Sequence, residues 1–143
     1  MTTNPDPLAQ KDQGLNCCQA VVAPLAEELG IDLSLALRIA NPFGAGIART
    51  GSVCGAVVGA LLVIGLRDGM RAPGDAAARE RTMALSRRFL ERFRELNGAT
   101  ECNALLGVDV NTPEGFETAR SSGLFATVCP RAIESARRIL AEL

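Results

Sequence analysis

Cysteine is the residue type in this chain whose chemistry stands out. The sequence contains five cysteines and no histidine, so imidazole is excluded as a metal ligand, a haem ligand and a general acid or base. The gaps between the cysteines are wide and uneven, unlike the paired C-x-x-C spacing of zinc ribbons and ferredoxins. Their joint chemistry therefore depends on whether folding brings them together. In chain order they are Cys17, Cys18, Cys54, Cys102 and Cys129.

Four of these cysteines are predicted to lie at or within the first turn of a helix. Asn16 is a natural N-cap, and Gln19 three residues later completes a capping box that puts Cys17 at the first helical position. The other predicted starts are Thr50 or Ser52 as the cap before Cys54, Thr100 as the cap before Cys102, and Cys129 itself as the cap before Pro130.

A helix start favours the thiolate form of cysteine. Its unpaired N–H groups and the positive end of the helix dipole together act like about half a positive charge. Thiolate is the form that attacks disulfides and ligates metals, and four thiolates together would repel one another unless a cation lay between them. Cys18 is rotated by about 100° from Cys17 around the helix, so we expect it to pack in the core. Core packing as a small apolar residue is the alternative for each of the others.

The element that must organise these sites is the stretch 50–65. It is apolar on every side and has glycines at positions 51, 55 and 59, which is typical of a buried helix that a neighbouring backbone approaches closely. We expect an all-α, single-domain bundle of about five to six helices around this central helix. Residues 1–14 are predicted to form a flexible arm, and residues 15–143 the helical domain. The other predicted helices are 15–30 with a kink or shifted start at Pro24, 32–40, 75–97, 100–107, 112–122 and 130–143.

Composition excludes several classes of partner. Fifteen basic and sixteen acidic residues give a net charge of -1, so we expect no nucleic-acid partner. The longest apolar run, 53–66, is shorter than the roughly 20 residues that span a bilayer, and no signal peptide is evident. We therefore expect a cytoplasmic protein without membrane contact, a setting in which cysteines serve metal binding or redox work rather than structural disulfides.

The link 43–52, with the sequence FGAGIARTGS, precedes the central helix. It contains glycines and an arginine before a helix start, which are the ingredients of an anion site. It lacks the lysine and the preceding strand of a Walker P-loop. We interpret it as a tight connection near Cys54, because turns require glycine, and Arg49 could balance thiolate charge from this position.

The chain resembles a family of redox-active proteins named for the pattern C_GCAxxG_C_C. The segments that carry the resemblance are N-C-C-Q-A-V at 16–21, T-G-S-V-C-G-A-V-V-G-A at 50–60, N-G-A-T-E-C-N-A-L-L-G-V-D at 97–109 and C-P-R-A-I at 129–133. The central motif here reads V-C-G-A-V-V-G instead of G-C-A-x-x-G. The resemblance implies a small all-helical protein, and related sequences joined to split-Soret cytochromes suggest iron–sulfur electron transfer. It assigns the family's cysteines to Cys17, Cys54, Cys102 and Cys129.

Three functions follow as hypotheses. In the first, Cys17, Cys54, Cys102 and Cys129 ligate an iron–sulfur cluster, most simply [2Fe–2S], and pass electrons to a protein partner. In the second, Cys17 or Cys18 and a distant cysteine cycle between thiol and disulfide, as in an oxidoreductase or redox sensor. In the third, the protein is a helical module that holds zinc or forms a homodimer through its glycine stripe.

Overall fold

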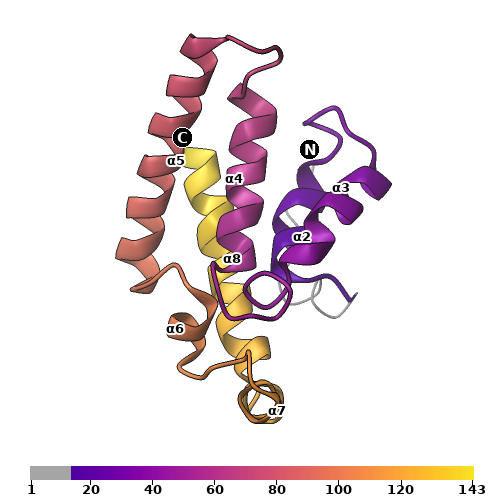
Figure 1. The fold of residues 1–143 in the computed structure, drawn as a ribbon, viewed down its shortest axis with the longest axis vertical. Helices are drawn as coiled ribbons and strands as arrows, with labels where there is room; N and C mark the ends of the chain where they lie inside the picture. Colours follow the sequence, from indigo (N-terminus) through magenta and orange to yellow (C-terminus); the bar gives the residue numbers. More distant parts are fainter. Residues whose placement is uncertain (1–13) are drawn as a thin grey trace.

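A computed structural model of the chain describes residues 14–143, and within them the fold is all-helical, as predicted (Figure 1). The predicted arm lies outside these residues except for Gly14. Seven α-helices and two 3-10 helices are present in the described part, slightly more than expected. They are α2 (Cys17–Val22), η1 (Ala23–Leu25), α3 (Leu33–Ala40), η2 (Asn41–Phe43), α4 (Gly55–Asp68), α5 (Ala76–Asn97), α6 (Cys102–Leu106), α7 (Pro113–Ser121) and α8 (Leu124–Glu142). None of these helices is both long enough and apolar enough to cross a membrane.

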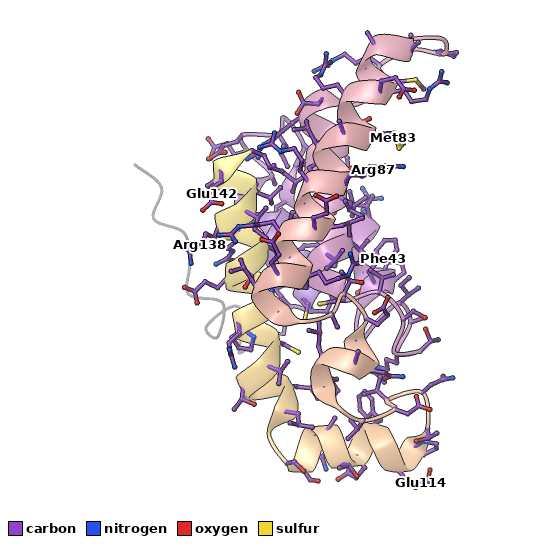
Figure 2. All side chains as sticks on the ribbon, turned by 90° about the vertical axis from the view of Figure 1, so that its left-hand side faces the viewer. Phe43, Met83, Arg87, Glu114, Arg138 and Glu142 are labelled. Atoms are coloured by element: carbon purple, nitrogen blue, oxygen red, sulfur yellow. The ribbon has the colours of Figure 1, made fainter. Side chains whose placement is uncertain are left out.

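Helix α4 is the centre of the bundle, as its apolar sequence predicts. It packs against α2, α5 and α8, and α5 and α8 also pack on each other (Figures 1 and 2). Its close contact with α2 depends on glycine, because a Cβ atom on Gly59 would lie 3.0 Å from the Cys18 carbonyl oxygen and from Val21 Cβ. The prediction is wrong at two points: Gly51 precedes the helix, and Gly65 at the end of the stretch is exposed.

The first predicted helix is shorter than its sequence pattern indicates. The capping box is confirmed, since the Gln19 N–H donates to Asn16 Oδ1 at 2.9 Å and the Asn16 N–H donates to Gln19 Oε1 at 3.0 Å. However, α2 ends at Val22 and a 3-10 turn containing Pro24 follows. Proline has no N–H to donate to the carbonyl four residues earlier. That carbonyl, of Ala20, instead accepts a hydrogen bond of 2.8 Å from Arg137 Nη2 on α8.

The last helix begins earlier than predicted, and this corrects the position of Cys129. Helix α8 starts at Leu124, directly after Gly123 at φ 72°, so Cys129 and Pro130 lie inside it rather than at its start. Phe125 packs in this extra segment, beside Phe116 of α7 at a ring-centroid distance of 5.4 Å. This tertiary contact explains why the helix extends ahead of the proline, although a proline within a helix costs one backbone hydrogen bond.

Candidate functional site

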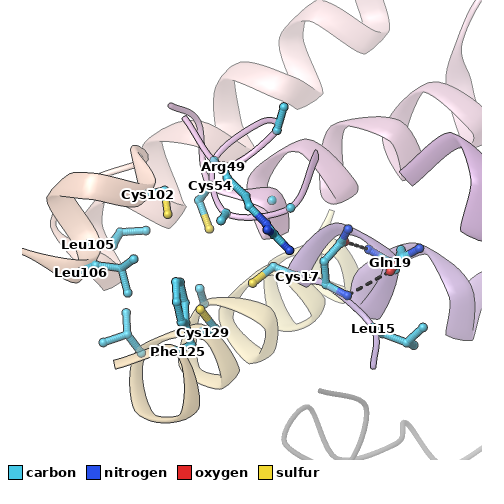
Figure 3. A pocket seen from close by; sticks show the side chains of 18 of the residues that line it. Leu15, Cys17, Gln19, Arg49, Cys54, Cys102, Leu105, Leu106, Phe125 and Cys129 are labelled. Carbon is cyan, nitrogen blue, oxygen red and sulfur yellow. Dashed lines mark hydrogen bonds between the residues drawn. The ribbon is translucent and has the colours of Figure 1, made fainter. Parts of the chain in front are cut away.

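Four cysteines from distant parts of the chain line one cavity of about 640 Å³, which we call the sulfur cavity (Figure 3). They are Cys17, Cys54, Cys102 and Cys129, the four residues that the sequence singled out. Each is 6–7% exposed, and none of the four forms a disulfide. Cys18 is fully buried and is not among the residues that line the cavity, in line with its predicted core role. Cys17, Cys54 and Cys102 therefore reach the cavity from helix starts, whereas Cys129 reaches it from the interior of α8.

Cys54 and Cys102 are held together by a short backbone pairing. An isolated antiparallel bridge joins Val53 and Glu101. The Cys54 N–H donates to the Thr100 carbonyl at 2.8 Å, and the Cys102 N–H donates to the Ser52 carbonyl at 2.7 Å. Because these segments are extended, α6 begins one residue later than a cap at Thr100 would allow, and α4 begins two residues later than a cap at Ser52 would allow.

The predicted caps of both helices are consequently wrong. Cys54 is itself the N-cap residue of α4 and does not lie within its first turn. Glu101 takes the N-cap position of α6 in place of Thr100, with Cys102 as the first helical residue. The bridge joins segments nearly 50 residues apart, and a local sequence pattern carries no signal for such a pairing.

Cys17 reaches the cavity because α2 approaches the start of α4 closely. A Cβ atom on Gly55 would lie 3.1 Å from Cys17 Cβ and 2.9 Å from the Phe43 carbonyl oxygen. A side chain at position 55 would therefore push Cys17 away from Cys54. Glycine at this position is a requirement of the site and not only of the helix packing.

The loop between α3 and α4 contains an unusual left-handed turn. Residues 45–49 all have positive φ angles between 49° and 75°, and four of the five are not glycine. A left-handed conformation costs roughly 1–2 kcal/mol for each non-glycine residue, so this turn is strained. Backbone hydrogen bonds close it, from the Arg49 N–H to the Gly44 carbonyl at 2.9 Å and from the Gly51 N–H to the Ala45 carbonyl at 3.1 Å. The sequence predicted a tight connection here but not its handedness.

This left-handed turn rests directly on the cysteine site. A Cβ atom on Gly46 would lie 2.7 Å from Cys102 Cβ. After the turn, Gly51 lies against the Asn103 side chain, and the Gly51 carbonyl accepts a hydrogen bond of 3.1 Å from the Asn103 N–H. Asn103 Nδ2 in turn donates to Asp109 Oδ1 at 2.9 Å. The turn is thereby fixed to α6 and to the loop after it.

One charged side chain, Arg49, is found among the described residues that line the sulfur cavity. In Figure 3 the Arg49 side chain extends from the left-handed turn past Cys54 toward Cys17. Its guanidinium carbon lies 5.1 Å from the centroid of the Phe116 ring, a cation–π contact. The cavity lining contains no carboxylate within the described part of the chain, so Arg49 makes its charge positive while the thiols are protonated.

The expectation of thiolates at helix starts fails for Cys54. Burial raises the pKa of the Cys54 thiol to about 12, with a further rise from Cys17 and a smaller one from Cys102. Hydrogen bonds from the Ala56 and Val57 N–H groups oppose this rise in pKa but are outweighed. The pKa of Cys18 is likewise raised to about 12, by burial first and then by Cys17 and Cys54. The loss of solvation therefore exceeds the effect of the helix start.

Cysteine is the usual metal-ligating residue type in the described lining of the cavity, which contains no histidine, aspartate or glutamate. Within residues 14–143, no group of three or more cysteine, aspartate or glutamate side chains is arranged to hold a single metal ion. The cavity volume is in the range of pockets that hold small molecules and cofactors. Its apolar wall includes Leu105, Leu106, Phe125 and Val128. The arrangement thus offers four thiols around a space larger than one ion requires.

Comparison with known proteins gives one family. A family model described as "Putative redox-active protein (C_GCAxxG_C_C)" matches residues 15–143, which is all but the N-terminal segment. No curated protein and no solved structure matches the chain.

Proposed function

The chain belongs to the C_GCAxxG_C_C family, and from this premise we propose that it is an electron-transfer protein whose sulfur cavity holds an iron–sulfur cluster, most simply [2Fe–2S]. The proposed ligands are Cys17, Cys54, Cys102 and Cys129. The observation that carries the proposal is that these four thiols line a single cavity. Four cysteine thiolates are the usual ligand set of [2Fe–2S] and [4Fe–4S] clusters.

The lack of a preformed single-ion group among the described residues favours a cluster over zinc. A tetrahedral zinc site needs its four ligands around one ion, at about 2.3 Å for each sulfur, and no such group exists among the described residues. A [2Fe–2S] cluster would share the four cysteines between two iron centres and would therefore suit ligands that stand further apart than those of one ion. A cavity of about 640 Å³ accommodates that wider arrangement.

The surrounding residues have roles that suit such a group. Burial and neighbouring sulfurs raise the pKa of Cys54, and a cationic metal centre reverses this effect by stabilising the thiolates. When bound, the cluster would supply a reversible one-electron couple. The Gly55 contact holds Cys17 next to Cys54, and the apolar wall formed by Leu105, Leu106 and Val128 limits the access of water.

The test is metal analysis of protein purified or reconstituted without oxygen. We expect coloured protein with equal amounts of iron and acid-labile sulfide, and loss of most of the iron when any proposed ligand is replaced by serine. Cys18→Ala is the matched control: it removes a fifth cysteine beside the site and should keep the iron. Colourless, iron-free protein after reconstitution would refute the proposal. The proposed ligand set would also be refuted if Cys18→Ala lost as much iron as the serine variants while its helical circular dichroism stayed unchanged.

Thiol–disulfide exchange is the alternative for the same residues. It requires an accessible thiolate. Burial raises the pKa of Cys18, one of the two candidate nucleophiles, to about 12, and that of Cys54 likewise, which disfavours the thiolate of both at pH 7. The alternative would be supported instead if mild oxidation of the metal-free protein gave one defined internal disulfide in mass spectrometry. The electron donor or acceptor, the cytoplasmic location and a homodimer stay predictions.

A further inference from the structure

We propose that Arg49 sets the reduction potential of the sulfur site, and that the left-handed turn 45–49 holds its guanidinium over the cavity for that purpose. This inference rests on the proposed function. It assigns a role to the charged residue that lines the cavity and to the most strained backbone segment of the described chain.

The first observation is the charge balance of the cavity. Four thiolate ligands bring negative charge into a largely apolar pocket, and Arg49 is the residue of opposite charge in its described lining. Arginine keeps its charge at every pH that the fold would survive. The contact with the Phe116 ring limits the directions that the guanidinium can take, and in Figure 3 the side chain runs past Cys54 toward Cys17.

The second observation is the backbone that carries Arg49. Left-handed residues that are not glycine are uncommon and tend to cluster at functional sites, where surrounding contacts enforce them. Here Ala45, Ile47, Ala48 and Arg49 all adopt this conformation. With right-handed residues the backbone of this turn would follow a different path. The close contacts of Gly46 with Cys102 and of Gly51 with Asn103 leave no room for the backbone to move toward α6, so they hold the turn in its left-handed form.

The electrostatic consequence has a definite sign. On reduction, one electron passes from an external one-electron donor to the site, which becomes more negative by one charge. A nearby cation stabilises the reduced form more than the oxidised form and so raises the potential. Because Arg49 is exposed, dissolved salt should screen the effect.

The experiment is a redox titration of the iron-loaded protein followed by absorption. Three variants are compared with the wild type: Arg49→Gln removes the charge, Arg49→Lys keeps it, and Arg87→Gln removes the same charge from the exposed face of α5, where Figure 2 labels Arg87 beside Met83. At a fixed ambient potential, we expect Arg49→Gln to lower the ratio of reduced to oxidised site about tenfold, or 59 mV for a one-electron couple. Arg49→Lys should keep most of the wild-type ratio, Arg87→Gln should match it, and high salt should shrink the difference.

The outcomes separate this inference from the function on which it rests. Iron-loaded Arg49→Gln protein with the wild-type potential would overturn the role of Arg49 alone. So would a shift in Arg49→Lys as large as that in Arg49→Gln, because side-chain packing and not charge would then be responsible. If Arg49→Gln takes up no iron, the test passes to Arg49→Lys. Iron-loaded Arg49→Lys protein with the wild-type potential would support a role for the positive charge, whereas failure of both variants to take up iron would overturn the role of Arg49 in setting the potential. Wild-type protein that takes up no iron would refute the proposed function itself.

Discussion

Gly59→Ala and Gly65→Ala make the same chemical change in one helix and should have opposite effects on stability. Both residues lie in α4. At Gly59 a new Cβ atom would lie 3.0 Å from the Cys18 carbonyl oxygen and 3.0 Å from Val21 Cβ. At Gly65, which is exposed, it would meet nothing within 4 Å. The pair therefore isolates the cost of separating α2 from α4.

The magnitudes follow from packing and helix propensity. Alanine in place of glycine within a helix stabilises it by roughly 0.5–1 kcal/mol, which is the whole effect expected for Gly65→Ala. Gly59→Ala has the same gain, but overpacking of a tight core contact costs typically about 1–3 kcal/mol. Since helix propensity cancels between the two variants, Gly59→Ala should be less stable than Gly65→Ala by about 1–3 kcal/mol. The shift of α2 should also move Cys17 away from Cys54 and weaken iron binding in the Gly59 variant.

The assay is urea unfolding of the metal-free, reduced variants followed by circular dichroism. The free energy of unfolding from each curve gives the difference directly, and similar m-values would confirm that the unfolded states are comparable. Equal stabilisation by the two alanines would refute the reasoning, because α2 would then not depend on a bare backbone at position 59. Full iron binding by a destabilised Gly59→Ala protein would refute the link between this contact and the position of Cys17.

Three further predictions concern the metal-free protein. Folding raises the pKa of Cys54 from about 9 to about 12, so burial of its neutral thiol stabilises the fold fully below pH 9. As the pH rises from 9 toward 12, the free energy of unfolding should fall by up to about 4 kcal/mol, at 1.36 kcal/mol per pH unit. Urea unfolding that is unchanged between pH 8 and pH 10.5 would contradict this prediction. Ala48→Gly should stabilise the protein by about 1 kcal/mol because it relieves a left-handed alanine, whereas Ala84→Gly on the exposed face of α5 should destabilise it by a similar amount. Arg137→Met should cost about 1–3 kcal/mol, since the Ala20 carbonyl loses its donor from α8, and an unchanged melting temperature would count against that role.

The parts of the fold that the sequence predicts are those with local chemistry. Asn16 and Gln19 form their capping box within four residues of chain. The Thr112 side chain caps α7 directly before Pro113, as the Thr-Pro pair indicates. Gly98 ends α5 in the left-handed conformation expected of a C-terminal glycine. In each case the deciding hydrogen bond or backbone angle involves residues that are neighbours in the sequence.

The starts of α4, α6 and α8 depend on residues that are distant in the sequence. The Val53–Glu101 bridge delays two of these helices, and the packing of Phe125 brings the third forward past Pro130. A proline after a cysteine has the same local pattern whether it begins a helix or lies inside one, so only the tertiary contacts distinguish the two. The handedness of the turn before α4 is likewise enforced by what packs against Gly46 and Gly51.

The sequence singled out the four cysteines that line the sulfur cavity, but partly for a reason that the structure does not support. The argument from helix starts requires the dipole to favour thiolate, an effect worth at most about 2 kcal/mol in a partly buried site. Cys129 has no helix start, and at Cys54 the cost of burial is larger than the help from two N–H groups. What the four residues share is therefore a largely buried position in the wall of one cavity. Burial favours the neutral form of the Cys54 thiol, and binding of a cation there would have to release its proton. Such a thiol is poorly suited to rapid attack on passing disulfides, which favours the proposed metal group over thiol exchange.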